Sequence, residues 1–310
     1  MNNRKVVVVG GGVLGSQIAF QAAYQGFDVT FWLRMESSKT RTQPKLDRLK
    51  SIYLSSLEAL KPYCGTDYPY YPHGLVADLS QTSVADIEAK QAQVEKAYAS
   101  IVLELDMAKA CKDAMIVIEA MAEDFQAKCD IYQKLSQYLE PNTILASNSS
   151  TMVPSQFVDH IKRPERYLAM HFANEIWKYN IVEIMGHSHT DPHVFEQAVA
   201  FGKEIGMEPI CLQKEQPGYV LNSLLVPFLN AALNLYANGI ADAPTIDKTW
   251  RKATGAPYGP MQILDIVGLQ TAYNIARMDP SMKKEAEMLK SYIDQGKTGV
   301  QAKAGFYSYE

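Results

Sequence analysis

The amino-acid sequence predicts an α/β domain with a mostly parallel sheet, followed by an all-helical domain. Up to about residue 213, short apolar runs alternate with helix-length amphipathic segments, which is the pattern of parallel strands joined by helices. After Gln216 the strand signals nearly vanish, and helix-length segments follow one another. A glycine-rich turn joins the first strand to the first helix.

The predicted strands are mostly continuous apolar runs, as expected for strands buried on both faces of a sheet. They lie at 6–9, 28–33, 101–105, 115–118, 143–146, 166–171, 181–185 and 209–212. Helices are predicted between them at 13–24, 125–139 and 192–205. Between about 40 and 100 the pattern indicates an irregular helical insertion with a tip rich in tyrosine and proline.

The last third of the chain reads as helices at 220–237, 244–254, 260–278 and 280–295, each with a proline near its start. We therefore expect two domains. The first spans 1–213 and carries the insertion, and the second spans 214–310.

Composition excludes several classes of partner and site. The net charge of -4 gives no general attraction to nucleic acid. No apolar run reaches the roughly 18 residues that span a bilayer, so we expect no membrane partner. Cys64, Cys111, Cys129 and Cys211 have neither zinc-site nor disulfide spacing. We expect buried, reduced thiols and a cytoplasmic protein.

The turn after the first strand has the pattern Gly10-x-Gly12-x-x-Gly15. Gly10 permits a tight turn, Gly12 lets a pyrophosphate approach the backbone, and Gly15 lets the helix pack close to the strand. The helix opens at Val13 and Leu14, where free N–H groups can bind phosphate. Strand, turn and helix together predict a Rossmann-type dinucleotide site.

The end of the second strand bears on which dinucleotide binds. An NAD site usually carries Asp or Glu there, to bind the ribose 2′-hydroxyl. This sequence has Leu33 followed by Arg34, and the nearest acid is Glu36. A guanidinium suits the 2′-phosphate of NADP. The neighbours within reach are Ser37, Ser38, Lys39 and Arg41. The predicted cofactor is NAD or NADP, with Arg34 tilting slightly toward NADP; a solvated Arg34 stacked on adenine is the alternative.

Later stretches resemble one family over nearly the whole chain. They are "IVIEAMAED" (116–124), "LASNSST" (145–151), "HFANEIWKYNIVEIM" (171–185), "QPGYVLNSLLVPFL" (216–229), "GPMQILDIVGL" (259–269) and "GFYSY" (305–309). With the glycine loop, they resemble L-3-hydroxyacyl-CoA dehydrogenases. The resemblance implies a Rossmann domain, an all-α dimerisation domain and a homodimer.

The resemblance also implies a catalytic tetrad at Ser150, His171, Glu183 and Asn222. An imidazole titrates near neutral pH, so His171 can take the hydroxyl proton while hydride leaves the same carbon. Glu183 can orient the ring and stabilise imidazolium. Ser150 and Asn222 can hold substrate oxygens.

Cofactor contacts carried over from the family are Glu123, Lys128 and Asn174. The simpler explanation is an acid at a helix start for Glu123 and a solvated cation for Lys128.

The sequence also departs from the family pattern. The acid after the second strand is missing. The usual "HFFNP" reads "HFANE", with Ala173 and Glu175, and Gln301 replaces a cofactor-side lysine. The insertion at 60–80 is longer than expected, and acyl-CoA contacts cannot be mapped onto it. These departures put the substrate and the cofactor in doubt.

Three functions stay open. The first is a dehydrogenase of 3-hydroxyacyl-CoA with a role in fatty acid metabolism. The second is a dehydrogenase of a free 3-hydroxy acid or another small polar alcohol, of gulonate- or carnitine-dehydrogenase type. The third is a non-enzymatic, crystallin-like protein, which an intact tetrad disfavours. His187, His189 and His193 lie close in sequence, but without a fixed frame of further ligands they predict no metal site.

Overall fold

A computed structural model describes residues 4–309 of the chain. The chain forms two compact units, which divide between Val220 and Leu221. The expected boundary at 213/214 precedes this division and falls in the segment before helix α7 (Tyr219–Ala237).

The first unit contains one eight-stranded sheet with the order β3-β2-β1-β4-β5-β6-β7-β8. All neighbours pair in parallel except β6 and β7, which are antiparallel, so the predicted α/β class with a mostly parallel sheet is confirmed. The strands are β1 (Lys5–Val9), β2 (Asp28–Trp32), β3 (Val102–Glu104), β4 (Ile116–Glu119), β5 (Ile144–Ser147), β6 (Tyr167–Phe172), β7 (Ile181–Met185) and β8 (Glu208–Cys211).

The helices of the first unit are α1 (Val13–Tyr24), α2 (Glu36–Leu60), α3 (Val84–Ser100), α4 (Met107–Cys111), α5 (Phe125–Leu135) and α6 (Pro192–Glu204). Those of the second unit are α7, which starts in the first, α8 (Ala243–Thr254), α9 (Pro260–Val267), α10 (Leu269–Ala276) and α11 (Lys283–Asp294). Short 3-10 turns join several of them: η1 (Lys61–Tyr63), η2 (Pro154–His160), η3 (Pro164–Arg166), η4 (Pro280–Met282) and η5 (Val300–Ala302).

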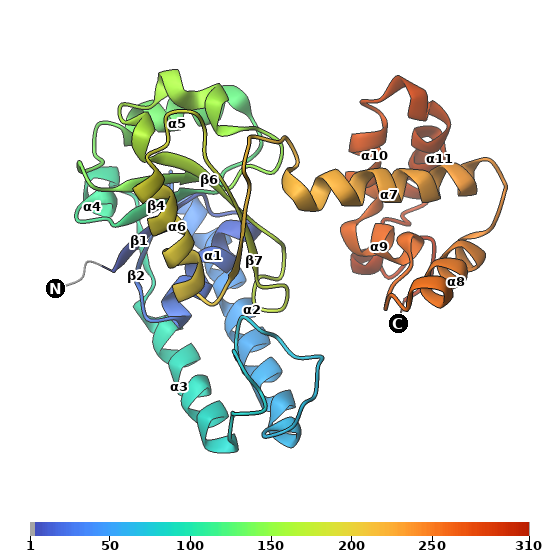
Figure 1. The fold of residues 1–310 in the computed structure, drawn as a ribbon, viewed down its shortest axis with the longest axis horizontal. Helices are drawn as coiled ribbons and strands as arrows, with labels where there is room; N and C mark the ends of the chain where they lie inside the picture. Colours follow the sequence, from blue (N-terminus) through green and yellow to red (C-terminus); the bar gives the residue numbers. More distant parts are fainter. Residues whose placement is uncertain (1–3, 310) are drawn as a thin grey trace. The chain divides into compact units, whose positions relative to one another are not determined.

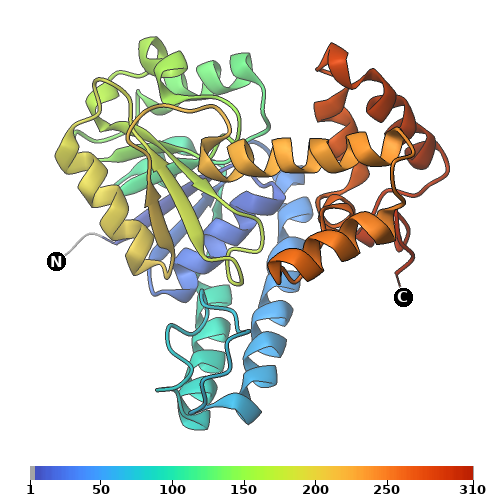
Figure 2. The ribbon, with the colours of Figure 1, turned by 45° about the vertical axis from the view of Figure 1, so that its right-hand side comes forward.

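Helices cover the sheet on both faces, because successive strand residues point to opposite sides. Val6 and Val8 belong to a core with α1, α2, α3 and α6. Val7 and Val9 belong to a second core with α4, α5 and η2. Figures 1 and 2 show this three-layered arrangement of the first unit. It explains why the strands are apolar without alternation.

The insertion is helical, as predicted, and consists of the two long helices α2 and α3 on either side of a segment of turns. Only one stripe of α2 is buried, which includes Tyr53 and Leu57. Tyr53 packs edge-on against Phe20 of α1 at 4.8 Å and donates a hydrogen bond to Gln21 at 2.7 Å. The insertion is therefore packed onto the helix that follows the glycine loop.

In the second unit, two buried carboxylates tie the end of the chain to the helices. Asp247 accepts hydrogen bonds from the N–H of Met261 and the hydroxyl of Tyr307. Asp265 accepts from the N–H groups of residues 306 and 307 and from the hydroxyl of Tyr309. The single helix predicted at 260–278 is wrong. Gly268 has a φ of +93°, which breaks the segment into α9 and α10.

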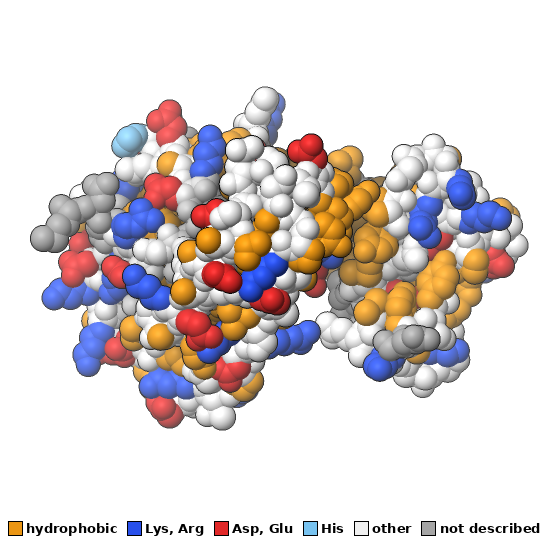
Figure 3. Space-filling model, turned by 90° about the horizontal axis from the view of Figure 1, so that it is seen from below, with side chains coloured by type: hydrophobic (Ala, Val, Ile, Leu, Met, Phe, Trp, Pro, Cys, Tyr) orange, Lys and Arg blue, Asp and Glu red, His pale blue; other side chains and the backbone are white. Residues whose placement is uncertain are grey.

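Helix α7 bears on the expectation that no apolar run reaches the length that spans a bilayer. Within the described residues one helix, α7, is long and apolar enough to cross a membrane by length and composition alone. Of its apolar stretch, 17% is buried. The helix is continuous, but its apolar sequence is interrupted by asparagine and proline residues at Asn222, Pro227, Asn230 and Asn234. Large apolar side chains are also exposed elsewhere in the second unit, including Ile240 at 70%. Figure 3 shows apolar side chains gathered on its surface.

The four cysteines are free thiols in different environments. Cys111 and Cys129 are buried, Cys64 is half-buried and Cys211 is exposed. The expectation of four buried thiols is therefore correct for two of them.

Candidate active site

The candidate active site lies at the edge of the sheet where the parallel strands β1, β4, β5 and β6 end. The glycine loop follows β1, and Ser150 follows β5. His171 is the penultimate residue of β6. In open α/β sheets ligands bind beyond the carboxyl ends of strands, so this edge is where a substrate and a dinucleotide would meet.

The glycine loop forms a cradle that side chains would fill. Gly10 has a φ of +115°, and a Cβ there would lie 2.7 Å from the carbonyl oxygen of Ala120. A Cβ on Gly15 would lie 2.3 Å from the carbonyl oxygen of Gly10. Gly12 precedes α1, no side chain caps the first N–H groups of that helix, and Val13 is 64% exposed. The cradle fits a pyrophosphate.

A cavity of about 350 Å³ adjoins this loop. Its lining includes Arg34, Arg41 and Lys134, against one acid, Asp130. Glu36 is not in the lining, and its carboxylate pairs with Lys39 at 3.2 Å. The missing ribose-binding acid is therefore not replaced by Glu36.

Thr42 gives this cavity an unused polar group. Its side chain is completely buried and lines the cavity, and its Oγ1 has no hydrogen-bond partner among the described residues. A Cβ on Gly11 would lie 2.5 Å from that oxygen, so Thr42 lies directly beneath the glycine loop. A buried hydroxyl without a partner is costly, and a bound ligand can satisfy it. Thr42 was not found from the sequence because it lies on a different element from the loop.

Three predicted catalytic side chains form a hydrogen-bonded row. Nδ1 of His171 lies 2.9 Å from Oε2 of Glu183, and Nε2 lies 3.1 Å from Oγ of Ser150. His171 and Glu183 are paired residues of antiparallel strands β6 and β7, which explains their contact. They are 5% and 1% exposed. An imidazole held by a carboxylate at one nitrogen, with the other nitrogen beside a hydroxyl, can transfer a proton.

Glu123 lies beside this row. Its Oε1 accepts the N–H of Ser150 at 2.7 Å, and its Oε2 accepts the hydroxyl of Ser149 at 2.7 Å. In this structure the Glu123 carboxylate thus holds the turn that carries Ser150. Glu123 is exposed at this edge of the sheet, and its contact with a cofactor stays a prediction.

Lys128 differs from expectation. Its side chain is completely buried, and Nζ lies 2.8 and 2.9 Å from the two carboxylate oxygens of Glu119. The same carboxylate accepts from Tyr132, Ser147 and the N–H of Met121. The expected direct contact of Lys128 with a cofactor is therefore corrected, because its ammonium is buried and paired with Glu119 at the end of β4. Sequence spacing could not identify Glu119 as its partner.

Two asparagines have separate positions. Asn174 is exposed in the loop after β6, next to Glu175, whose φ is +58°. Gln17 of α1 anchors this loop by accepting the N–H of Glu175 at 2.9 Å. Asn222 lies in the first turn of α7 and belongs to the second unit, so it is not grouped with His171 here.

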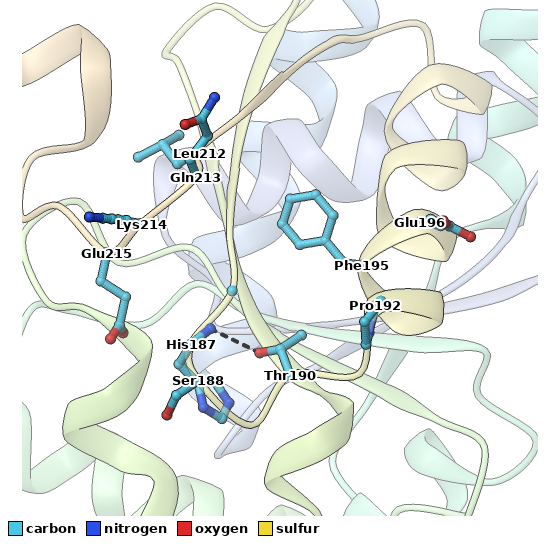
Figure 4. A pocket seen from close by; sticks show the side chains of 11 residues that line it. His187, Ser188, Thr190, Pro192, Phe195, Glu196, Leu212, Gln213, Lys214 and Glu215 are labelled. Carbon is cyan, nitrogen blue, oxygen red and sulfur yellow. Dashed lines mark hydrogen bonds between the residues drawn. The ribbon is translucent and has the colours of Figure 1, made fainter.

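The histidine-rich segment after β7 forms part of a different cavity, of about 540 Å³. It lies at the opposite edge of the sheet, because β7 runs antiparallel to β6. Figure 4 shows His187, Ser188 and Thr190 on this loop, with Thr190 bonded to the N–H of His187. Nε2 of His187 lies 3.0 Å from the carbonyl oxygen of Pro164. Within residues 4–309 no group of three metal-ligating side chains was found.

The comparisons with known proteins identify a family over nearly the whole chain. The model of the 3-hydroxyacyl-CoA dehydrogenase NAD-binding domain matches residues 73–216, and the model of the C-terminal domain matches 218–309. The chain is 29% identical to the mitochondrial hydroxyacyl-coenzyme A dehydrogenase of Rattus norvegicus, covering 99% of this chain and 91% of the relative. It is 26% identical to a 3-hydroxybutyryl-CoA dehydrogenase of Clostridioides difficile, covering 98% and 99%.

Among solved structures, one reported for the dual catalysis of dicarbonyl compounds by diketoreductase superposes with a TM-score of 0.86. It is 43% identical to this chain and covers 100% of both chains. Both halves of the chain match one family, and the protein belongs to the 3-hydroxyacyl-CoA dehydrogenase family of nicotinamide-dependent oxidoreductases.

Proposed function

We propose that this protein interconverts the hydroxyl and keto groups at C3 of a 3-hydroxyacyl substrate carried as a CoA thioester. The observation that carries the proposal is the hydrogen-bonded row Glu183–His171–Ser150 at the carboxyl edge of the sheet. The family and the curated relatives support the substrate class.

The proposed chemistry divides the roles among the side chains. Nε2 of His171 accepts the proton of the substrate hydroxyl during oxidation and returns it during reduction. Glu183 holds the hydrogen on Nδ1, which leaves the Nε2 lone pair free, and it stabilises the imidazolium that forms. Ser150, 3.1 Å from Nε2, is within reach of the same substrate oxygen. We assign Asn222 to the substrate oxygens from the family resemblance alone.

A bound nicotinamide ring supplies the hydride acceptor or donor. The chain's own contribution is to bind the dinucleotide. The glycine cradle and the start of α1 would hold the pyrophosphate. At the far end, Arg34 and Arg41 line the cavity together with the unpartnered hydroxyl of Thr42. We propose that this cavity admits the 2′-phosphate of NADPH and favours it slightly over NADH, since cations outnumber acids there.

A second candidate substrate is a free dicarbonyl or 3-hydroxy acid. The specific observation in its favour is the 43% identity to a diketoreductase over the whole chain. The loop after the catalytic strand supports it, because Ala173 and Glu175 alter bulk and charge next to His171. For this second candidate the proton transfer by His171 is the same. Only the group that stands in place of the CoA thioester differs.

We also propose that the protein acts as a cytoplasmic homodimer. Several large apolar residues of the second unit are exposed, among them Leu224 at 70% and Met278 at 82%, and a partner surface would remove them from water. A symmetric partner would cover the same patch on both copies.

The test is an initial-rate assay at 340 nm with a substrate panel. Acetoacetyl-CoA, free acetoacetate and a small free dicarbonyl compound are each reduced with NADH and with NADPH. The proposal predicts the highest kcat/KM for acetoacetyl-CoA. A preference for either free compound would support the second candidate, and no turnover of any of them would overturn both.

A further inference from the structure

The start of α7 contacts both members of the His171–Glu183 pair. The ring of Tyr219 stacks on the imidazole of His171, with centroids 4.6 Å apart and an interplanar angle of 18°. The next residue, Val220, donates its N–H to Oε1 of Glu183 at 2.8 Å. Two consecutive residues without an assigned role thus contact the two groups that would move the proton.

Tyr219 is itself held firmly. Its side chain is completely buried, and its hydroxyl donates to the carbonyl oxygen of Ser149 at 2.8 Å. Burial raises the pKa of its phenol far above the usual range, so the group remains a donor. Its φ is +54°, in the left-handed region that large side chains rarely adopt. Such a conformation persists only where the surroundings fix it.

The stacking and the hydrogen bond of Tyr219 both bear on the surroundings of Nε2 of His171, the nitrogen that would take the proton. A flat ring stacked on the imidazole limits its tilt, and the tilt decides where the Nε2 lone pair points. The bond to the Ser149 carbonyl fixes the turn whose next residue, Ser150, lies 3.1 Å from Nε2. The carboxylates that act on the Tyr219 phenol are Glu123, Glu183 and Glu119. Glu183 bonds His171 and Glu123 bonds the N–H of Ser150, so these two are themselves held by the row.

We propose that Tyr219 is a positioning residue, which holds the imidazole of His171 and the Ser149–Ser150 turn in the geometry required for proton transfer. The inference rests on the proposed role of His171. The ring and the hydroxyl make separable contributions: the ring aligns the imidazole, and the hydroxyl aligns the turn. Misplacing a reacting group by about 1 Å lowers rates by up to about 100-fold.

Two variants separate these contributions. Tyr219→Phe keeps the stacked ring and loses the bond to Ser149, so kcat should fall by about three- to tenfold. Tyr219→Leu loses both, so kcat should fall by about 10- to 100-fold. The KM for substrate and the Kd for the reduced cofactor should stay within about twofold, because neither is proposed to contact Tyr219. The matched control is Tyr24→Phe, which removes another buried phenol that donates to a backbone carbonyl, that of Leu75. It should destabilise the fold without changing kcat.

A second readout does not depend on turnover. In the protein without cofactor, nuclear magnetic resonance of the imidazole signals reports the ring current of the stacked tyrosine. His171 is identified among the six histidines by the signal lost in His171→Gln. Its ring-proton shifts should be retained in Tyr219→Phe and displaced in Tyr219→Leu.

The outcomes are distinguishable. If the wild type turns over no substrate, the proposed function fails, while the resonance shifts still test the stacking. If the wild type is active, the positioning role is overturned by either of two results. One is unchanged kcat in Tyr219→Leu; the other is an equal fall in Tyr24→Phe with unchanged His171 signals in Tyr219→Leu.

Discussion

Replacing Glu183 with glutamine removes one charge and almost no volume, which makes it a sharp test of the proton-transfer geometry. Glu183 is 1% exposed and uses both oxygens as acceptors, Oε2 for Nδ1 of His171 and Oε1 for the N–H of Val220. A glutamine has one carbonyl oxygen and one NH₂ group. It can therefore accept from only one of these two donors.

Either orientation of the glutamine is unfavourable. If its NH₂ faces His171, Nδ1 must accept, the hydrogen moves to Nε2, and the nitrogen needed as base is blocked. If its NH₂ faces Val220, two donors oppose each other in a buried place, at a cost of about 1–3 kcal/mol. The first orientation avoids this opposition of two donors. The tautomer of His171 with its hydrogen on Nε2 should therefore dominate.

We predict that Glu183→Gln lowers kcat by about 10² to 10⁴, the range expected when an oriented imidazole loses its carboxylate partner. The Kd for the reduced cofactor, measured by fluorescence titration, should change by less than about twofold. The assay is the initial rate at 340 nm at saturating substrate. A kcat within threefold of the wild type, in a folded variant, would refute the assignment of Glu183.

Four further predictions concern other parts of the molecule. Arg34→Ala should weaken NADPH binding by about 10- to 100-fold, as loss of a charge-assisted phosphate contact does, and leave NADH unchanged; equal effects in fluorescence titrations of the two would make Arg34 a bystander. Lys128→Met leaves the Glu119 carboxylate buried without its cation and should lower the free energy of unfolding by about 3–5 kcal/mol in denaturant titration; a loss below about 1 kcal/mol would contradict the buried pair. Burial lowers the pKa of His187, so the unfolded state takes up the proton at higher pH than the folded state, and the free energy of unfolding falls as the pH drops below about 6.5. His187→Gln should flatten this part of the curve of unfolding free energy against pH. An unchanged slope would contradict the role of His187. Light scattering at micromolar concentration should give about twice the chain mass of 34.6 kDa, and the monomer mass would contradict the homodimer.

The parts of the fold that sequence could predict are those set by local pattern. Continuous apolar runs such as 6–9 mark strands that are covered on both faces, and the glycine turn marks the point where strand meets helix. The insertion was predicted to be helical, but the bounds of the long helix α2 were not, because most of its surface is polar and Pro44 lies inside it. Thr40, whose carbonyl loses its partner at that proline, is at an exposed position, which makes the proline tolerable.

The candidate site was predictable where residue types carry chemistry, as at His171 and Glu183. What sequence could not predict is which groups tertiary packing brings together. Lys128 was predicted to contact a cofactor, with a solvated cation as the alternative, and only the fold places it against Glu119. No role was assigned to Tyr219 from the sequence, and only the fold stacks it on the imidazole. Both effects depend on contacts between elements distant in sequence, which periodicity does not encode.

The central claim is that His171 transfers the proton of the substrate hydroxyl. The most direct measurement compares wild type and His171→Ala in single-turnover reduction, followed at 340 nm, with cofactor affinity measured in parallel. The account predicts a rate lower by at least about 100-fold with a Kd for the reduced cofactor that is nearly unchanged. A rate close to that of the wild type, at full cofactor occupancy, would contradict it.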